Sequence, residues 1–230
     1  MNDVVTIVCL ANSRKPPSGR CIAGKEKAGG AYGKWVRPVS VRPTHEISEE
    51  ERRFEDGTSP RLLDVITIPI IAPTPAGHQT ENVLIDAAYY WEKVGTATWA
   101  DLGQMLDRPA TLWTNGNSTF HGHNDRVGAT AVAQVRNSLL LIRPDGLRIR
   151  VSAESQFAGP SRRRVRALFH HNGEYHSFVV TDPIVEQTLL ARRDAEYTVP
   201  EAHLAVSLSE PYSDGDCFKL VAALFARQPL

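Results

Sequence analysis

Short apolar runs separated by polar stretches that contain glycine or proline recur along the whole chain. Runs of this length that are rich in β-branched residues predict strands rather than long helices. In the first half they cover residues 4–10, 20–24, 34–40, 63–71 and 83–85. The charged stretch 46–55 predicts a short helix, and Thr98 followed by Asp101 is a weak helix start before 102–106.

The second half repeats the pattern, with strands predicted over 129–135, 139–143, 147–151, 165–170, 175–181, 202–208 and 218–225. Pro144-Asp145-Gly146 and Asn172-Gly173 indicate tight turns, since these residues tolerate the backbone angles that such turns need. Asp182 and Pro183 predict the cap and first residue of a helix that runs to about residue 193.

Each half therefore contains several short strands with one short helix among them. Five strands with a helix after the third describe an OB barrel, and 230 residues accommodate two such units. The polar run from Trp113 to Asp125 separates the halves, which predicts a first OB-like barrel over 1–115 and a second over 116–230. The expected fold is mainly β with a few short helices, and a single decorated β-sandwich is the alternative.

Composition indicates a packed globular protein, with 42% hydrophobic residues. No apolar run approaches the ~20 residues that span a bilayer. The start of the chain lacks the basic, extended form of a signal peptide, so we expect a cytoplasmic protein without a membrane partner. Three widely spaced cysteines, Cys9, Cys21 and Cys217, favour reduced and mostly buried thiols over a disulfide framework or a zinc site.

Charge is balanced over the whole chain, with 26 basic and 26 acidic residues, but not within residues 1–42. Eight cations face only Asp3 and Glu26 there, which leaves +6. A positive stretch with an aromatic ring is typical of a groove in which cations follow phosphates and the ring stacks on a base. The candidate contacts are Arg14, Lys15, Arg20, Lys25, Lys34, Trp35 and Arg37. The alternative places Trp35 in the core, and the alternation does not decide between them.

A second basic set lies in residues 126–166, where nine arginines face only Asp145 and Glu154 and leave +7. Arginine suits bidentate phosphate contacts and stacking better than lysine does. The set comprises Arg126, Arg136, Arg143, Arg148, Arg150, Arg162, Arg163, Arg164 and Arg166. We expect Arg126, Arg162, Arg163 and Arg164 to contact nucleic acid, and an ordinary solvated face is the alternative.

The segment 78–82, His-Gln-Thr-Glu-Asn, is dense in donors and acceptors. His78, Gln79 and Asn82, with Asn12 and Ser13, could read the edge of a base. A loop that satisfies its own backbone groups is the favoured alternative.

Catalytic motifs are missing from the sequence, which contains no nucleophile elbow, Walker loop or dinucleotide fingerprint. His121, His123 and Asp125 form the nearest approach to a metal motif, and Cys21 the nearest to a nucleophile. Neither has the accompanying ligands or base, so we expect no metal and no cofactor. A Cys- or metal-dependent hydrolase is the least favoured function.

Several strings resemble the dual OB-containing domain of prokaryotes. They are Cys9-Leu-Ala-Asn-Ser-Arg-Lys15, Gly19-Arg-Cys-Ile-Ala-Gly24, Trp35-Val-Arg-Pro-Val-Ser40, His78-Gln-Thr-Glu-Asn82, Thr181-Asp-Pro183 and Ser207-Leu-Ser-Glu-Pro-Tyr212. The resemblance spans nearly the whole chain. It implies two tandem OB folds and a role in recognising nucleic acid, as a sensor within a bacterial antiviral defence or nucleic-acid-processing system.

These observations lead to one main hypothesis, a non-catalytic protein that binds nucleic acid, single-stranded in preference, through two OB folds. The competing hypothesis is an adaptor that docks a neighbouring effector enzyme, with charge setting the choice of partner.

Overall fold

The computed structural model describes residues 3–155 and 159–230, which belong to two compact units. Unit 1 comprises Met1–Met105 and Arg136–Ser138, and unit 2 comprises Leu106–Val135 and Leu139–Leu230. The boundary suggested by the sequence, between residues 115 and 116, lies in a polar stretch of unit 2.

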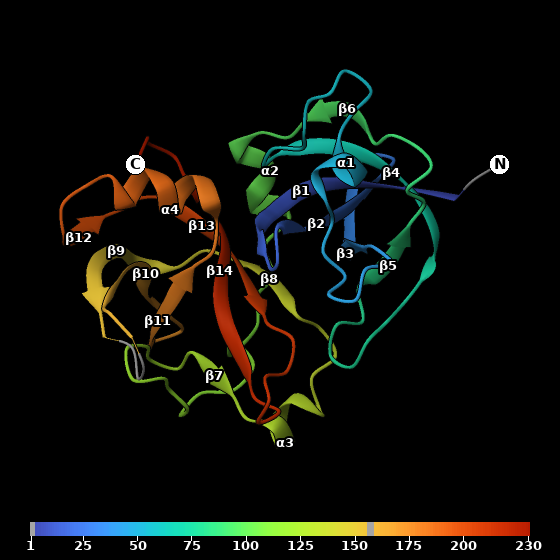
Figure 1. The fold of residues 1–230 in the computed structure, drawn as a ribbon. Coiled ribbons are helices and arrows are strands. Elements are labelled where there is room, and N and C mark those ends of the chain that lie inside the picture. The colour runs from blue at the N-terminus through green and yellow to red at the C-terminus, as the bar shows by residue number, and fades with distance from the viewer. Residues whose placement is uncertain (1–2, 156–158) are drawn as a thin grey trace. The chain divides into compact units, whose positions relative to one another are not determined.

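Unit 1 is a closed five-stranded barrel with one additional strand (Figure 1). Its strands are β1 (Asp3–Lys15), β2 (Gly19–Ala28), β3 (Ala31–Val39), β4 (Asp64–Pro73), β5 (Asn82–Ile85) and β6 (Glu92–Thr96). The order is β1-β2-β3-β5-β4, and β1 then pairs with β4 to close the ring. Strands β3 and β5 are parallel, the other pairs are antiparallel, and β6 extends β4. This is the arrangement of an OB barrel.

Alternation along these strands fills the inside of the barrel. Ile7, Cys9, Ile22, Val36 and Ile66 are buried in one core cluster, as the period-2 pattern requires. Helix α1 (Glu49–Arg52) lies between β3 and β4, the position of the helix in an OB fold. Its start is fixed by a capping box between Ser48 and Glu51. Helix α2 (Trp99–Gln104) follows β6.

Unit 2 has the same OB strand path without the closing pair. Its strands are β7 (Arg126–Val127), β8 (Leu139–Ile142), β9 (Asp145–Glu154), β10 (Arg162–His171), β11 (Glu174–Val180), β12 (Ala195–Thr198), β13 (Ala202–Leu208) and β14 (Cys217–Ala226). The path β9-β10-β11-β14-β13 repeats the order of unit 1, including a parallel pair, β11 with β14. At its ends β9 pairs with β12 and β13 pairs with β8.

The helix of the second OB fold is α4 (Pro183–Leu190), which lies between β11 and β12 in the chain. Asp182 caps it by accepting from the backbone N–H groups of Ile184 and Val185. The β10–β11 hairpin turns at Asn172 and Gly173, whose φ angles of 50° and 85° match the turn that this dipeptide predicts. In Figure 1, α4 lies over one end of the unit 2 barrel.

The prediction of a mainly β fold with a few short helices, built from two tandem OB-like barrels, is confirmed. The strand predicted over 129–135 is wrong: helix α3 (Ala129–Val132) occupies its start. Only Val132 of α3 is buried, and the side chain of Asp216 accepts from the N–H of Ala129 at the helix start. A strand in a sheet buries alternate side chains on one face. This segment buries only one, and its alanines favour a short helix.

Within the described residues, no helix is long and apolar enough to cross a membrane. The free cysteines Cys9 and Cys217 are buried and Cys21 is half-buried.

Candidate functional site

The basic end of the β1–β2 hairpin is accessible in unit 1. Arg14 and Arg20 are opposite each other in the strand register, and Lys15 is opposite Gly19. Arg14 is exposed, whereas Lys15 and Arg20 are half-buried. Among the predicted contacts nearby, Asn12 donates to the carbonyl of Pro60 at 2.8 Å and Ser13 is buried. The hairpin end therefore presents cations. Asn12 and Ser13, predicted to read the edge of a base, are respectively bonded to the backbone and buried.

The outer face of the unit 1 barrel is buried rather than open. Val8 and Ala23 are fully buried there, and Trp35 is only 9% exposed. The ammonium of Lys25, itself buried, lies 5.7 Å from the centre of the Trp35 ring. Lys34, the neighbour of Trp35 on β3, is exposed. The structure thus agrees with the alternative in which Trp35 is a packed residue, because neither face of its ring is open to a base.

Arg37 forms a buried ion pair instead of facing solvent. Its Nη2 donates to Ser138 Oγ at 2.6 Å and lies 3.2 Å from Glu81 Oε1, while the Ser138 hydroxyl donates to that same oxygen. The side chains of Arg37 and Glu81 are 3% and 4% exposed. A guanidinium buried and paired in this way stabilises structure and is unavailable to a ligand.

The predicted reading loop 78–82 is also buried. His78, Gln79 and Asn82 have exposed fractions of 3%, 7% and 3%. The backbone groups of Ala76 and Gln79 bond to each other, and the side chain of Asn82 donates to that of Gln79 at 3.4 Å. These backbone bonds agree with the alternative of a loop that satisfies its own backbone groups.

Two of the predicted arginines in unit 2 are held by carboxylates. Arg126 lies 2.7 Å from both Asp214 and Asp216. Arg163 lies 2.7 Å from Asp194 and also donates to the backbone carbonyls of Leu190 and Arg192. Both side chains join segments of unit 2 to one another. Arg162 is exposed and Arg164 half-buried on the other face of β10.

That outer face of β9 and β10 carries most of the arginines of the second basic set. The register places Arg162 opposite Glu154 and Arg166 opposite Arg150, and alternation adds Arg148 and Arg164 to the same side. Glu196 of β12 is opposite Arg150 and pairs with Arg148 and Arg150 at 2.7 Å each. Five arginines face two glutamates and Asp125, which lies 3.6 Å from Arg166, and leave +2 on this face.

A groove of about 380 Å³ lies on the same face. Its lining includes Phe120, His121, Glu154, Arg164, Arg166 and Val179. Phe120 is 92% exposed, and its ring is 4.7 Å from that of His121 in an edge-on arrangement. His121 Nε2 is 3.0 Å from the carbonyl oxygen of Ser155. The exposed phenyl ring can stack on a planar group of a ligand, while the half-buried guanidinium beside it binds an anionic group of the same ligand.

The loop that carries Phe120 is anchored by buried charges. Arg166 makes a bidentate pair with Glu154, at 2.6 and 3.1 Å, and its Nη1 is 3.6 Å from Asp125. Asp125 accepts from the backbone and side chain of Thr119, at 2.7 and 2.6 Å. A Cβ at Gly122 would lie 1.7 Å from Asp125 Oδ2, so only glycine fits this close approach. The arrangement fixes the loop before any ligand binds.

Lys219 strengthens the same anchor from β14. Its backbone N–H donates to the carbonyl of Asp125 at 2.9 Å, and its ammonium donates to the carbonyl of Thr114. Burial lowers the pKa of Lys219 to about 8, although the charge of Asp125 opposes that shift. Lys219 and Arg166 thus connect the Phe120 loop to strands on two sides.

The residues considered for metal or nucleophilic chemistry each have other neighbours. His123 is 5.2 Å, ring to ring, from Tyr175, and Cys21 is opposite Ser13 in the β1–β2 register. In the part of the chain that the structure describes, no three His, Cys, Asp or Glu side chains form a group that could hold a metal ion.

The sequence was also compared with known proteins. A family model described as the dual OB-containing domain matches residues 5–224. No curated protein matches the chain. A solved structure of a murine DNA-binding protein bound to double-stranded DNA aligns with 98% of this chain and 96% of its own, at 9% identity and a TM-score of 0.29. A structural likeness of that size carries no argument about fold or function.

Proposed function

The chain belongs to the dual OB-containing domain family, and on that premise we propose that it binds single-stranded nucleic acid on the outer face of β9 and β10. OB folds bind oligonucleotides on the face of their second and third strands and on the adjacent loops. In unit 2 those strands are β10 and β11. The groove reaches that face, since Arg164 and Arg166 of β10 and Val179 of β11 line it, and the adjacent strand β9 adds Arg148 and Arg150.

Charge supports the proposal, because phosphate contacts supply most of the affinity of such proteins. The face carries +2 in a chain of zero formal net charge. We propose Arg162 and Arg164 as its main phosphate contacts. Arg163, Arg126 and the buried Arg166 serve structure instead, because each is already held by a carboxylate.

The observation that carries the proposal is the 92% exposed ring of Phe120 beside this charged face. An aromatic ring left in water on an anchored loop contributes nothing to the core, but it can stack on a base. Only an unpaired base offers its flat side to such a ring, which favours single strands over duplexes.

Unit 1 adds cations at its own first hairpin, the loop that contacts ligands in OB folds. We propose Arg14, Lys15 and Arg20 as additional phosphate contacts. Lys25, Trp35, Arg37 and the loop 78–82 are outside this proposal because their side chains are buried.

The test is fluorescence anisotropy with short labelled single-stranded DNA, single-stranded RNA and duplex DNA at low salt. Phe120→Ala should weaken single-strand binding about five- to hundred-fold, because a stacked base is worth about 1–3 kcal/mol. Arg164→Gln should reduce the slope of log K against log salt by about 0.7, the value for one lost phosphate contact.

Matched controls are Tyr89→Ala and Arg61→Gln, which remove an exposed ring and an exposed cation from unit 1. Neither should change binding. Absence of binding to every oligonucleotide would refute the function, and unaltered binding by Phe120→Ala would move the interface away from this groove.

A further inference from the structure

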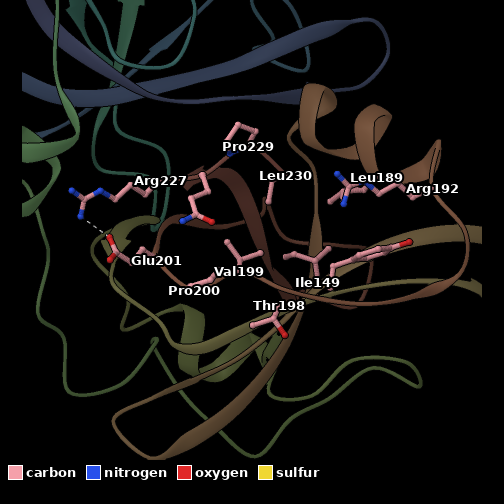
Figure 2. Close-up of a pocket in the computed structure, with 12 residues that line it drawn as sticks. Ile149, Leu189, Arg192, Thr198, Val199, Pro200, Glu201, Arg227, Pro229 and Leu230 are labelled. Atoms are coloured by element: carbon pink, nitrogen blue, oxygen red, sulfur yellow. Dashed lines mark hydrogen bonds and ion pairs between the residues drawn. The ribbon is translucent and has the colours of Figure 1, made fainter.

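A second cavity of about 540 Å³ opens at the end of the unit 2 barrel where α4 lies (Figure 2). Its walls come from β9, the end of α4, the segment from β12 to β13 and the residues after β14. Mouths of barrels are common sites for small ligands, and this volume is typical of such sites. It shares no lining residue with the Phe120 groove.

The inner part of this cavity is apolar. Ile149, Leu189 and Val199 are 0%, 1% and 6% exposed and belong to the core cluster of unit 2, and Leu230 packs against that cluster. Figure 2 shows Ile149, Val199 and Leu230 close together around the opening. Ile149 and Leu189 are already withdrawn from water, so the apolar surface that a ligand would cover is the exposed part of Val199 and Leu230.

The rim of the cavity is positively charged. Arg227 pairs with Glu201 at 2.8 Å, which leaves little net charge from that pair. The guanidinium of Arg192 lies 5.2 Å from the centre of the Tyr197 ring, and no carboxylate among the described residues pairs with it. Arg143 is near enough to Glu201 to lower its pKa further, after the larger effect of Arg227. Among the described side chains that line the cavity, Arg192 is therefore the one whose charge no carboxylate side chain balances.

We propose that this cavity binds a small organic anion, with its apolar body against Val199 and Leu230 and its negative group toward Arg192. Arg192 is the specificity residue in this arrangement, since stacking on Tyr197 holds its planar group at the rim. The inference does not depend on nucleic-acid binding, because the two sites use different residues.

The probe is anilinonaphthalene sulfonate, an aromatic anion whose fluorescence rises in apolar surroundings. Gln228→Trp places a large ring in the cavity from an exposed position and should abolish saturable binding of the probe. Arg192→Gln should raise the dissociation constant about ten-fold, since a charge-assisted contact is lost. Arg193→Gln, an exposed neighbour that does not line the cavity, should leave the constant unchanged.

N-phenylnaphthylamine, the same aromatic body without the sulfonate, separates anion recognition from apolar binding. It should bind at least ten-fold more weakly than the sulfonate, on the same estimate for the charge-assisted contact. Equal affinity for the two compounds would overturn the proposed anion site. Undiminished binding of the sulfonate by Gln228→Trp would show that the probe binds elsewhere and would also overturn it.

Discussion

The outer faces of the two OB barrels differ more than their strand orders do. In unit 1 this face holds Val8, Ala23 and Trp35, all buried, and its one guanidinium, Arg37, is paired in the interior. In unit 2 the equivalent strands, β9 and β10, carry five arginines and an open groove. The same strand topology therefore has a buried outer face in unit 1 and a charged, exposed outer face in unit 2. We expect ligand binding to follow the exposed charge rather than the fold.

Closure of the barrels differs as well. In unit 1, β1 pairs with β4 from Asp3–Ile70 to Val8–Val65. In unit 2 the corresponding strands, β9 and β13, pair with β12 and β8. The cavity of Figure 2 is lined by β9, β12 and the segment that leads to β13. The added strand β12 thus provides a cavity wall that the closed barrel does not have.

The largest expected effect comes from the buried ion pair of unit 1. Glu81→Ala leaves the Arg37 guanidinium buried without its carboxylate, which should lower the free energy of unfolding by about 3–5 kcal/mol. Urea unfolding followed by circular dichroism measures this. The comparison variant is Glu196→Gln, whose partially exposed pairs in unit 2 should contribute only about 0–1 kcal/mol. Similar losses in both variants would contradict the distinction between a structural and a surface-exposed cation.

Trp35 and Phe120 provide the next contrast. Trp35→Ala removes a buried indole and should cost about 3–5 kcal/mol of stability, with oligonucleotide binding retained under conditions where the variant is folded. Phe120→Ala removes an exposed ring, so its stability should stay within about 0.5 kcal/mol while binding falls. Thermal unfolding and anisotropy on the same samples separate the two effects. If Trp35→Ala kept its stability and lost binding, the stacking ring would belong to unit 1.

His176 makes unit 2 sensitive to acid. Its ring stacks on Phe169, and burial lowers its pKa to about 3, with Lys219 and then His171, His123 and His170 adding to the shift. Between about pH 6.5 and 3 the unfolded chain binds a proton at this site and the folded chain does not. Stability should therefore fall as pH decreases through this window, by at most about 1.4 kcal/mol per unit.

The measurement is urea unfolding at several pH values followed by tryptophan fluorescence, to which Trp113, packed on the core of unit 2, contributes. His176→Phe places an apolar ring beside Phe169 and Phe178 and should flatten the dependence in that window. An unchanged slope in this variant would assign the acid sensitivity to other groups.

The fold could be predicted from the sequence because its signals are local. Runs of β-branched residues predicted the strands. Asn172-Gly173 predicted the hairpin turn, and Asp182 predicted the start of the helix. The face of β3 could not be predicted. Trp35 and Val36 are both buried, so their alternation carries no information about which side is the core.

The candidate site was less predictable because its charges are cancelled by residues far away in the chain. Arg150 and Arg163 pair with Glu196 and Asp194, which are 46 and 31 residues away, and no short-range pattern indicates these partners. Phe120 was missed, although a signal existed. It is an isolated aromatic residue within the polar run 114–125, where no apolar neighbours could form a core around it.

The smallest expected effect tests whether the local charge of the β9–β10 face, rather than the total charge, determines binding. Glu196→Gln raises the charge of this face from +2 to +3 and releases Arg148 and Arg150 from their carboxylate. Single-strand affinity should rise about two- to five-fold at low salt, and the gain should shrink as salt increases. Glu92→Gln removes the same charge from an exposed position in unit 1 and should leave affinity unchanged. The two variants change the net charge equally, but only Glu196 lies beside the arginines of the β9–β10 face. Equal gains would therefore mean that the oligonucleotide is attracted by the charge of the whole molecule and not by this face.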